Sequence, residues 1–138
     1  MELLLVLDRS GSMRHSMQTL LSFAQDLVRD FEIGEGLTRV GVVQFNGDAQ
    51  VLLSLSSSEA AIDSAIGGGG PSSGMTSISD GIEHAVGLLG AGARPGVPVT
   101  MLVLTDGVQT VDGGDRAAIA AAVSAKARGV QLFAVGFG

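Results

Sequence analysis

The first apolar segment of the chain constrains the fold more than any other feature of the sequence. Residues Leu3 to Leu7 form an unbroken apolar run, which ends abruptly on the carboxylate of Asp8. A short apolar run bounded by turn residues is typical of a strand that is buried on both faces, as in a parallel sheet. Asp8 is therefore predicted to lie at the carboxyl end of a buried strand, where open α/β sheets bind their ligands.

Two hydroxyl residues, Ser10 and Ser12, follow Asp8 at alternate positions. If Arg9 and Gly11 point away, three small oxygen donors converge on one point. Hard oxygen ligands of this kind suit Mg²⁺, Mn²⁺ or Ca²⁺ and do not suit zinc or copper. The stretch therefore predicts a divalent-cation site directly after the first strand.

The remainder of the chain alternates between helical and strand-like patterns. Asn46 and Gly47 form a strong turn signal, which predicts a hairpin whose second strand is an antiparallel edge strand. The order of the patterns is β-α-β-β-α-α-β-α-β, which predicts an α/β sandwich. After the first strand, helices are predicted over 17–31, 59–66, 78–89 and 118–123, and strands over 39–45, 51–55, 99–104 and 130–135.

A second apolar strand, over 99–104, is also followed closely by a carboxylate, that of Asp106. If this strand lies beside the first, Asp8 and Asp106 can face one ion. Thr76 follows a glycine-rich loop and precedes a helix, so its hydroxyl can approach the same point. We therefore predict a metal site with five oxygen donors, completed by water: Asp8, Ser10, Ser12, Thr76 and Asp106.

Several of these polar residues also have a purely structural interpretation. Ser12 could be the N-cap of the following helix, and Asp106 with Gly107 could form a turn. Asp80 is most simply an acidic residue in the first turn of a helix, where it favours the helix dipole. The occurrence of both carboxylates at strand ends favours the metal site over these separate explanations.

The same segments resemble the von Willebrand factor type A domain family. The resemblance extends over essentially the whole chain and implies a single domain, residues 1–138, with a Rossmann-like three-layer α/β/α sandwich. Its central sheet would be mostly parallel, with one antiparallel edge strand, and the chain would lack the usual last helix, strand and helix of the family. The motifs that carry the resemblance are Asp8-Arg9-Ser10-Gly11-Ser12-Met13, Gly74-Met75-Thr76 and Leu104-Thr105-Asp106-Gly107.

The resemblance also implies a metal-ion-dependent adhesion site, or MIDAS. It makes Asp8, Ser10 and Ser12 the ligands from the first loop, Thr76 the ligand from the second and Asp106 the ligand from the third. The ion in this family is Mg²⁺ or Mn²⁺, and an Asp or Glu of a protein partner often completes its coordination. The expected function is thus a divalent-cation-dependent protein-binding module, for adhesion or as a scaffold.

Two other functions compete with this one: a metal-dependent hydrolase, and a metal-free structural or assembly domain. His15 and His84 are the only histidines that could act as bases near neutral pH. Gly70-Pro71-Ser72-Ser73-Gly74 matches the serine-hydrolase elbow in letters, but a glycine run precedes it where the elbow needs a strand. We therefore expect that the chain is not an enzyme.

Charge and composition restrict the partners and the setting. The net charge of −6 argues against nucleic acid and against an anionic membrane surface. No signal peptide or membrane-spanning segment is evident, so the expected setting is the cytoplasm or a domain excised from a larger protein. The apolar strand over 130–135 would form an exposed sheet edge, which suggests self-association. Met13 and Met75 are expected to form a modest apolar rim around the site.

Overall fold

The computed structural model describes residues 1–70, 72–106 and 114–137, whose strands form one five-stranded sheet. The strand order is β3-β2-β1-β4-β5, so the apolar first strand lies at the centre. The β1 strand pairs in parallel with β2 and β4, β5 is parallel to β4, and β3 is antiparallel to β2. The prediction of a mostly parallel sheet with one antiparallel edge strand is confirmed. The strands are β1 (Glu2–Asp8), β2 (Arg39–Phe45), β3 (Ala49–Ser56), β4 (Val99–Thr105) and β5 (Val130–Gly136).

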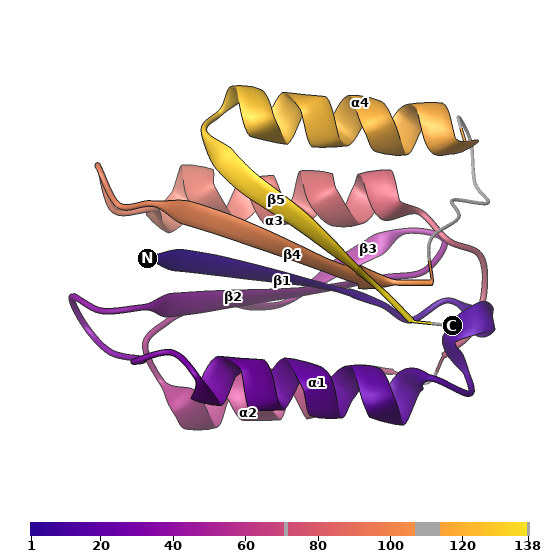
Figure 1. The fold of residues 1–138 in the computed structure, drawn as a ribbon, viewed down its shortest axis with the longest axis horizontal. Helices are drawn as coiled ribbons and strands as arrows, with labels where there is room; N and C mark the ends of the chain where they lie inside the picture. Colours follow the sequence, from indigo (N-terminus) through magenta and orange to yellow (C-terminus); the bar gives the residue numbers. More distant parts are fainter. Residues whose placement is uncertain (71, 107–113, 138) are drawn as a thin grey trace.

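Helices cover both faces of this sheet and complete the predicted three layers. The α1 and α2 helices lie on one face, and α3 and α4 lie on the other (Figure 1). A short 3₁₀ helix, η1, connects β1 to α1. The helices are η1 (Gly11–Met13), α1 (Met17–Arg29), α2 (Glu59–Gly67), α3 (Ile78–Gly92) and α4 (Gly114–Ala127).

The burial of β1 on both faces explains its continuous apolar sequence. Leu3 to Leu7 are fully buried, and successive side chains point to opposite faces of the sheet. Leu4 and Val6 belong to the core beneath α3 and α4, whereas Leu3, Leu5 and Leu7 belong to the core beneath α1 and α2. A strand in this position has no side that faces solvent, so the side chains from Leu3 to Leu7 are all apolar.

Gly81 allows the first half of α3 to lie close against the sheet. A Cβ atom at this position would lie 2.7 Å from Phe45 Cδ1 and 2.9 Å from Val6 Cγ1, closer than real Cβ contacts. The absence of a side chain therefore lets α3 lie directly over β1 and β2. This close packing brings the N-terminus of α3 toward the carboxyl ends of the central strands.

Element boundaries differ from the sequence prediction mainly at the ends of helices. The α3 helix continues through Gly92, beyond the predicted helix over 78–89. The α4 helix extends beyond the predicted 118–123 at both ends and stops before Gly129, which has φ +85°. No helix in the described part of the chain is long and apolar enough to cross a membrane. Pro71 and Gly107, which belong to the elbow and turn alternatives, lie outside the described residues.

Candidate metal centre

The site begins with Asp8, the last residue of β1, whose carboxylate is completely buried. Asp8 Oδ1 accepts hydrogen bonds from the Ser10 backbone N–H at 2.8 Å and from Ser10 Oγ at 2.6 Å. Asp8 Oδ2 accepts a hydrogen bond from Thr105 Oγ1 at 2.7 Å. These three donors compensate a carboxylate that has been withdrawn from water.

The two serine hydroxyls gather beside this carboxylate. Ser10 Oγ lies 2.6 Å from Asp8 Oδ1 and 3.1 Å from Ser12 Oγ. Neighbouring ligands around an octahedral Mg²⁺ are about 2.9 Å apart, which follows from the metal–oxygen distance of about 2.0–2.1 Å. The oxygens are held at these spacings by hydrogen bonds, and they are close enough together that one cation could contact all three.

Ser12 does not cap a helix through its side chain. The α1 helix begins at Met17 with Ser16 at its N-cap, and Ser12 lies within η1. The N-cap interpretation of Ser12 is therefore wrong. The side chain of Ser12 is exposed and is therefore available to bind a cation at the outer side of the oxygen cluster.

The loop that carries Thr76 is fastened to the first loop by backbone hydrogen bonds. The Gly11 N–H donates to the Gly74 carbonyl at 3.0 Å, and the Ser73 N–H donates to the Arg9 carbonyl at 2.9 Å. Thr76 is buried and directly precedes Ser77, the N-cap of α3. The two loops therefore meet at the carboxyl end of β1.

Asp106 directly follows β4, which is the neighbour of β1 in the sheet. Leu104 pairs with Leu7, and the next residue, Thr105, donates its hydroxyl hydrogen bond to Asp8. Asp106 is half-buried. The structure thus brings the five predicted residues to one end of the sheet, on three segments that adjoin Asp8.

The donor set fits a hard divalent cation. It contains two carboxylates and three neutral hydroxyls, which are ligands that Mg²⁺ and similar ions accept. The described residues contain no group of three or more His, Asp or Glu placed to hold a metal. A cation here would therefore depend on hydroxyls and would meet at most two protein carboxylates at this place.

The sequence interpretation missed two residues that shape this site. Thr105 bonds to Asp8, and the only sequence signal for it is its position immediately before Asp106. Arg9 is expected from the sequence only to point away from the oxygen cluster, yet its side chain is buried and bonds to the carbonyls of Ile66 and Gly70. Burial lowers the pKa of this guanidinium.

The sequence profile of the von Willebrand factor type A domain matches residues 2–138. The chain belongs to this family. Mouse (Mus musculus) matrilin-4 is 32% identical over 145 residues, covering 99% of this chain and 22% of matrilin-4. Mouse vitrin is 34% identical over 134 residues, covering 95% of this chain and 20% of vitrin. This type A domain thus spans about a fifth of the length of these two relatives.

A solved structure of proximal thread matrix protein 1 from the mussel byssus is also similar. It has a TM-score of 0.85 and 30% sequence identity, and the match covers 99% of this chain and 35% of that one. That structure has a zinc-occupied MIDAS motif. The expectation that an oxygen-ligand site of this type excludes zinc therefore does not hold for that relative.

The surroundings of the site in this type A domain differ in part from expectation. Met75 is 53% exposed, but Met13 is fully buried in the core, so the predicted methionine rim consists of Met75 without Met13. His15 and His84 are both exposed, and His84 Nδ1 donates to the Asp80 carbonyl at 2.8 Å. Asp80 lies in the first turn of α3, as predicted.

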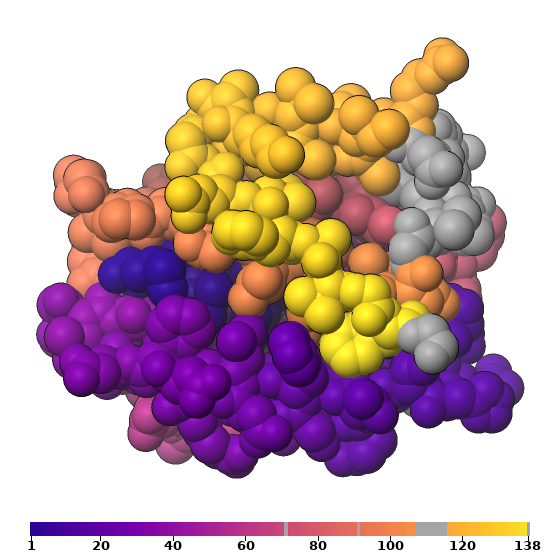
Figure 2. All heavy atoms as spheres, viewed as in Figure 1, coloured from indigo at the N-terminus to yellow at the C-terminus, as the bar shows by residue number. Residues whose placement is uncertain are grey.

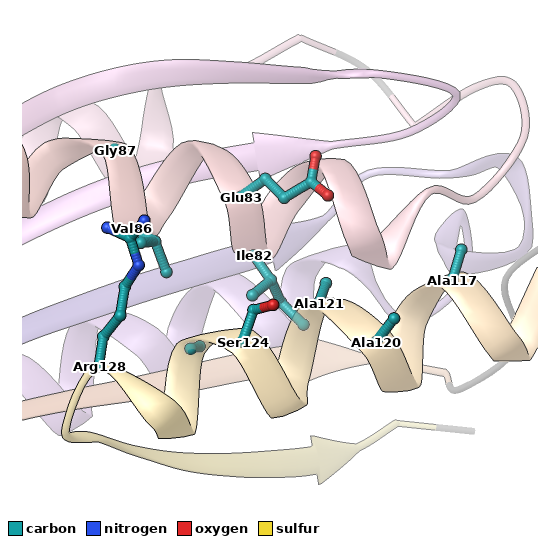
Figure 3. A pocket seen from close by; sticks show the side chains of 10 residues that line it. Ile82, Glu83, Val86, Gly87, Ala117, Ala120, Ala121, Ser124 and Arg128 are labelled. Atoms are coloured by element: carbon teal, nitrogen blue, oxygen red, sulfur yellow. The ribbon is translucent and has the colours of Figure 1, made fainter.

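A groove of about 500 Å³ lies away from this cluster, between α3 and α4. Its α4 side consists largely of alanines, because short side chains leave space between the two helices. In Figure 3, Arg128 extends from the end of α4 toward Val86 and Gly87. None of the five predicted site residues lines this groove.

Proposed function

We propose that this chain is a protein-binding module that recognises an acidic side chain of its partner through a divalent cation. Asp8, Ser10, Ser12, Thr76 and Asp106 are the proposed ligands, in one domain over residues 1–138. Mg²⁺ or Mn²⁺ is the proposed ion, with Ca²⁺ as a further candidate. When bound, the ion supplies a positive centre that attracts a carboxylate.

One observation carries this proposal: the oxygens of Asp8, Ser10 and Ser12 lie within 2.6–3.1 Å of their neighbours at the end of the central strand. An isolated buried aspartate would need only hydrogen-bond donors. The additional hydroxyl of Ser12, which lies beside Ser10 and not beside the carboxylate, supports a role in a coordination shell. The family membership supports the same interpretation, because the match extends over the segments that carry all five proposed ligands.

The balance of charge in the donor set explains why an acidic partner is proposed. Three of the five proposed ligands are neutral hydroxyls, so the protein supplies at most two negative charges. A carboxylate of the partner can then replace water without crowding several carboxylates together. Thr76 and Met75 lie on the second loop, where the exposed Met75 offers apolar contact to the same partner.

Calorimetric titration of Mn²⁺ and Mg²⁺ tests the metal site. We expect saturable binding to the natural chain and loss of binding in Asp8→Ala. Asp30→Ala is the control, because Asp30 is an exposed aspartate at the C-terminal end of α1, away from the loops that carry the proposed ligands. No saturable binding to the natural chain would contradict the proposed function.

A peptide titration tests the proposed partner chemistry. The metal-loaded protein would be titrated with a short glutamate-containing peptide and with the same peptide carrying glutamine. Binding of the glutamate peptide alone, abolished by a chelator, supports capture of a carboxylate. Equal binding of both peptides would contradict it.

The two competing functions receive less support. The names of matrilin-4 and vitrin indicate no enzymatic activity. Both histidines of this chain are exposed, and neither belongs to the proposed ligand set. Generic phosphatase and esterase substrates with added metal should therefore give no turnover. A metal-free structural role predicts a melting temperature that millimolar Mg²⁺ or Mn²⁺ leaves unchanged.

We also propose self-association through β5, an edge strand of the sheet. The strand carries no charged residue and no proline, and Phe133 at its middle is 54% exposed. Figure 2 shows the C-terminal yellow segment on the near face with no other segment across it.

Light scattering tests this proposal, and we expect it to show a dimer. Phe133→Lys should disrupt the dimer, whereas Val51→Lys, on the opposite edge strand, should leave it intact. A monomer at high protein concentration would contradict this.

The relatives also inform the proposed setting. Matrilin-4 and vitrin are several times longer than the matching region. We therefore propose that the chain acts as one domain of a larger protein. The relatives give no support to a cytoplasmic setting, which is the other expectation from the sequence.

A further inference from the structure

The most unusual group near the proposed metal site is the guanidinium of Arg9. Arg9 directly follows Asp8 and is 96% buried, but it forms no ion pair with any acidic residue in the described part of the chain. Its Nε is buried and has no hydrogen-bond partner among the residues that the structure describes. A buried charge without a counter-ion is costly, so its retention here needs a reason.

The Arg9 N–H donates to the Phe45 carbonyl at the end of β2, and the other hydrogen bonds of Arg9 connect the first loop to the end of α2 and the glycine-rich loop. Arg9 Nη2 donates to the Ile66 carbonyl at 2.9 Å, and Nη1 donates to the Gly70 carbonyl at 2.6 Å. The Arg9 carbonyl accepts from the Ser73 N–H at 2.9 Å. One residue thus makes three hydrogen bonds to residues 66–73.

The helix end explains how the charge is accommodated. Ile66 lies in the last turn of α2, where carbonyl groups lack helical partners and carry the negative end of the helix dipole. The last turn of α2 contains no basic residue of its own. Arg9 supplies the positive charge from another segment, so the helix end takes the place of a counter-ion.

The first part of the loop held in this way has no side chains that could hold it by packing. Residues 67–70 are all glycine. At Gly69 the guanidinium lies directly against the backbone, since a Cβ atom there would overlap Arg9 and Gln44 Oε1. Ser73 is three residues before Thr76, so the position of this loop bears directly on the proposed second-loop ligand.

We propose that Arg9 is a positioning residue that fastens the glycine-rich loop to the first loop and so orders the metal site. The link from this loop to cation affinity rests on the proposed function, because it takes Thr76 as a ligand. Residues that orient metal ligands typically change metal affinity by about 10- to 100-fold when they are replaced. Arg9 acts here through the backbone of the ligand-bearing loop.

Arg9→Met tests this inference, because methionine retains an unbranched, apolar side chain and removes all donors. Amide hydrogen exchange is measured without metal, and Mn²⁺ affinity is measured by calorimetry. We expect exchange at Ser73 and at Gly11, which bonds to Gly74, to become at least about tenfold faster, with exchange in β1 unchanged. We also expect Mn²⁺ affinity to fall by about tenfold or more. Arg14→Met, at an exposed position in the same connection, is the control.

Gly69→Ala gives a second test in which the charge is retained. Its Cβ would displace the guanidinium, whereas Gly70→Ala has open space around the new Cβ. We expect Gly69→Ala to reproduce the faster loop exchange and Gly70→Ala to leave it unchanged. Partial recovery in Arg9→Lys would further support the role of a donor at this position.

The two measurements separate this inference from the proposed function. Unchanged loop exchange in both Arg9→Met and Gly69→Ala would overturn the inference, even if the natural chain binds Mn²⁺. Equal acceleration in the loop and in β1 would also overturn it, because it would indicate a general loss of stability. Faster loop exchange without Mn²⁺ binding by the natural chain would support Arg9 as the loop fastener and overturn the proposed function.

Discussion

At the residue scale, Asp8 is an acid whose three hydrogen-bond donors come from two different strand ends. Ser10 donates twice from its own loop, and Thr105 donates from the end of β4. The hydrogen bond from Thr105 therefore joins two segments that both carry proposed metal ligands. Removing it should affect both the stability of the fold and the ordering of the site.

Thr105→Val should destabilise the metal-free protein. The substitution retains the shape of the side chain but leaves a buried carboxylate oxygen without one of its donors. Hydrogen bonds to charged groups contribute about 1.5–3 kcal/mol, so we expect the free energy of unfolding to fall by that amount. Urea denaturation measures the change.

Thr100→Val provides the matched control on the same strand. Within the described residues, the hydroxyl of Thr100 donates to the sulfur of Met1 at 3.5 Å, and this sulfur is a weak acceptor. This variant should change the free energy of unfolding by less than about 0.5 kcal/mol. If both variants lost the same free energy of unfolding, the hydrogen bond from Thr105 to Asp8 would contribute no more stability than the contact of Thr100 with Met1.

At the scale of elements, the position of α3 depends on a glycine at its contact with the sheet. Gly81→Ala would place a Cβ atom 2.7 Å from Phe45 Cδ1, and overpacking of this kind costs about 1–3 kcal/mol. The gain in helix propensity is smaller, about 1 kcal/mol, so we expect a net loss of stability. Thermal and urea unfolding measure it.

Gly87→Ala, on the same helix, should have the opposite sign. A Cβ atom added at Gly87 would have no neighbouring atom within 4 Å, so only the helix propensity changes. We expect this variant to be more stable by about 0.5–1 kcal/mol. If both variants were stabilised, close packing at Gly81 would not be what holds α3 against β1 and β2.

Elements were largely predictable from the sequence because their patterns are regular. The run from Leu3 to Leu7 and the acids after two apolar strands were sufficient to predict a β1 strand that is buried on both faces and Asp8 at its carboxyl end. Thr76 could be added to the predicted site because a helix follows the glycine-rich loop. These inferences use periodicity and chain direction, which depend little on individual side-chain orientations.

Side-chain direction beyond the strand ends was not predictable in the same way. Alternation in a strand stops at Asp8, so the pattern could not show that Arg9 turns toward the end of α2. Thr105 was predicted to follow the strand over 99–104 and was given no role of its own, because its contact with Asp8 depends on the pairing of β4 with β1. Met13 is the last residue of the first motif, so the sequence favoured a place for it on the rim of the site. In the structure, η1 directs its side chain into the core.

At the scale of the whole molecule, the sheet has two polar ends with different roles. The carboxyl ends of the parallel strands carry the proposed metal site. At the opposite end, the buried carboxylate of Glu2 accepts hydrogen bonds from Arg39 and Arg94. Arg94 Nη2 also donates to the Leu37 carbonyl, so this cluster ties the start of β1 to the segments that precede β2 and β4.

This cluster should make stability depend on pH. Burial alone would raise the pKa of Glu2, but the hydrogen bonds from Arg39 and Arg94 outweigh it and lower the pKa from 4.5 to about 2. A lowered pKa in the folded state adds stability that is fully present above pH 4.5 and is lost as the pH falls toward 2. The expected contribution near neutral pH is about 3 kcal/mol.

Glu2→Gln tests this dependence, because glutamine resembles the protonated acid in shape and charge. We expect the natural chain to be more stable than the variant near pH 6, with the difference shrinking steadily below pH 4.5 and becoming small near pH 2. Urea unfolding at a series of pH values measures this difference, and Glu32→Gln, at an exposed glutamate, is the control. A difference that stayed constant between pH 6 and pH 2 would mean that Glu2 supports the fold through its shape, and that the ion pairs with Arg39 and Arg94 add nothing to it.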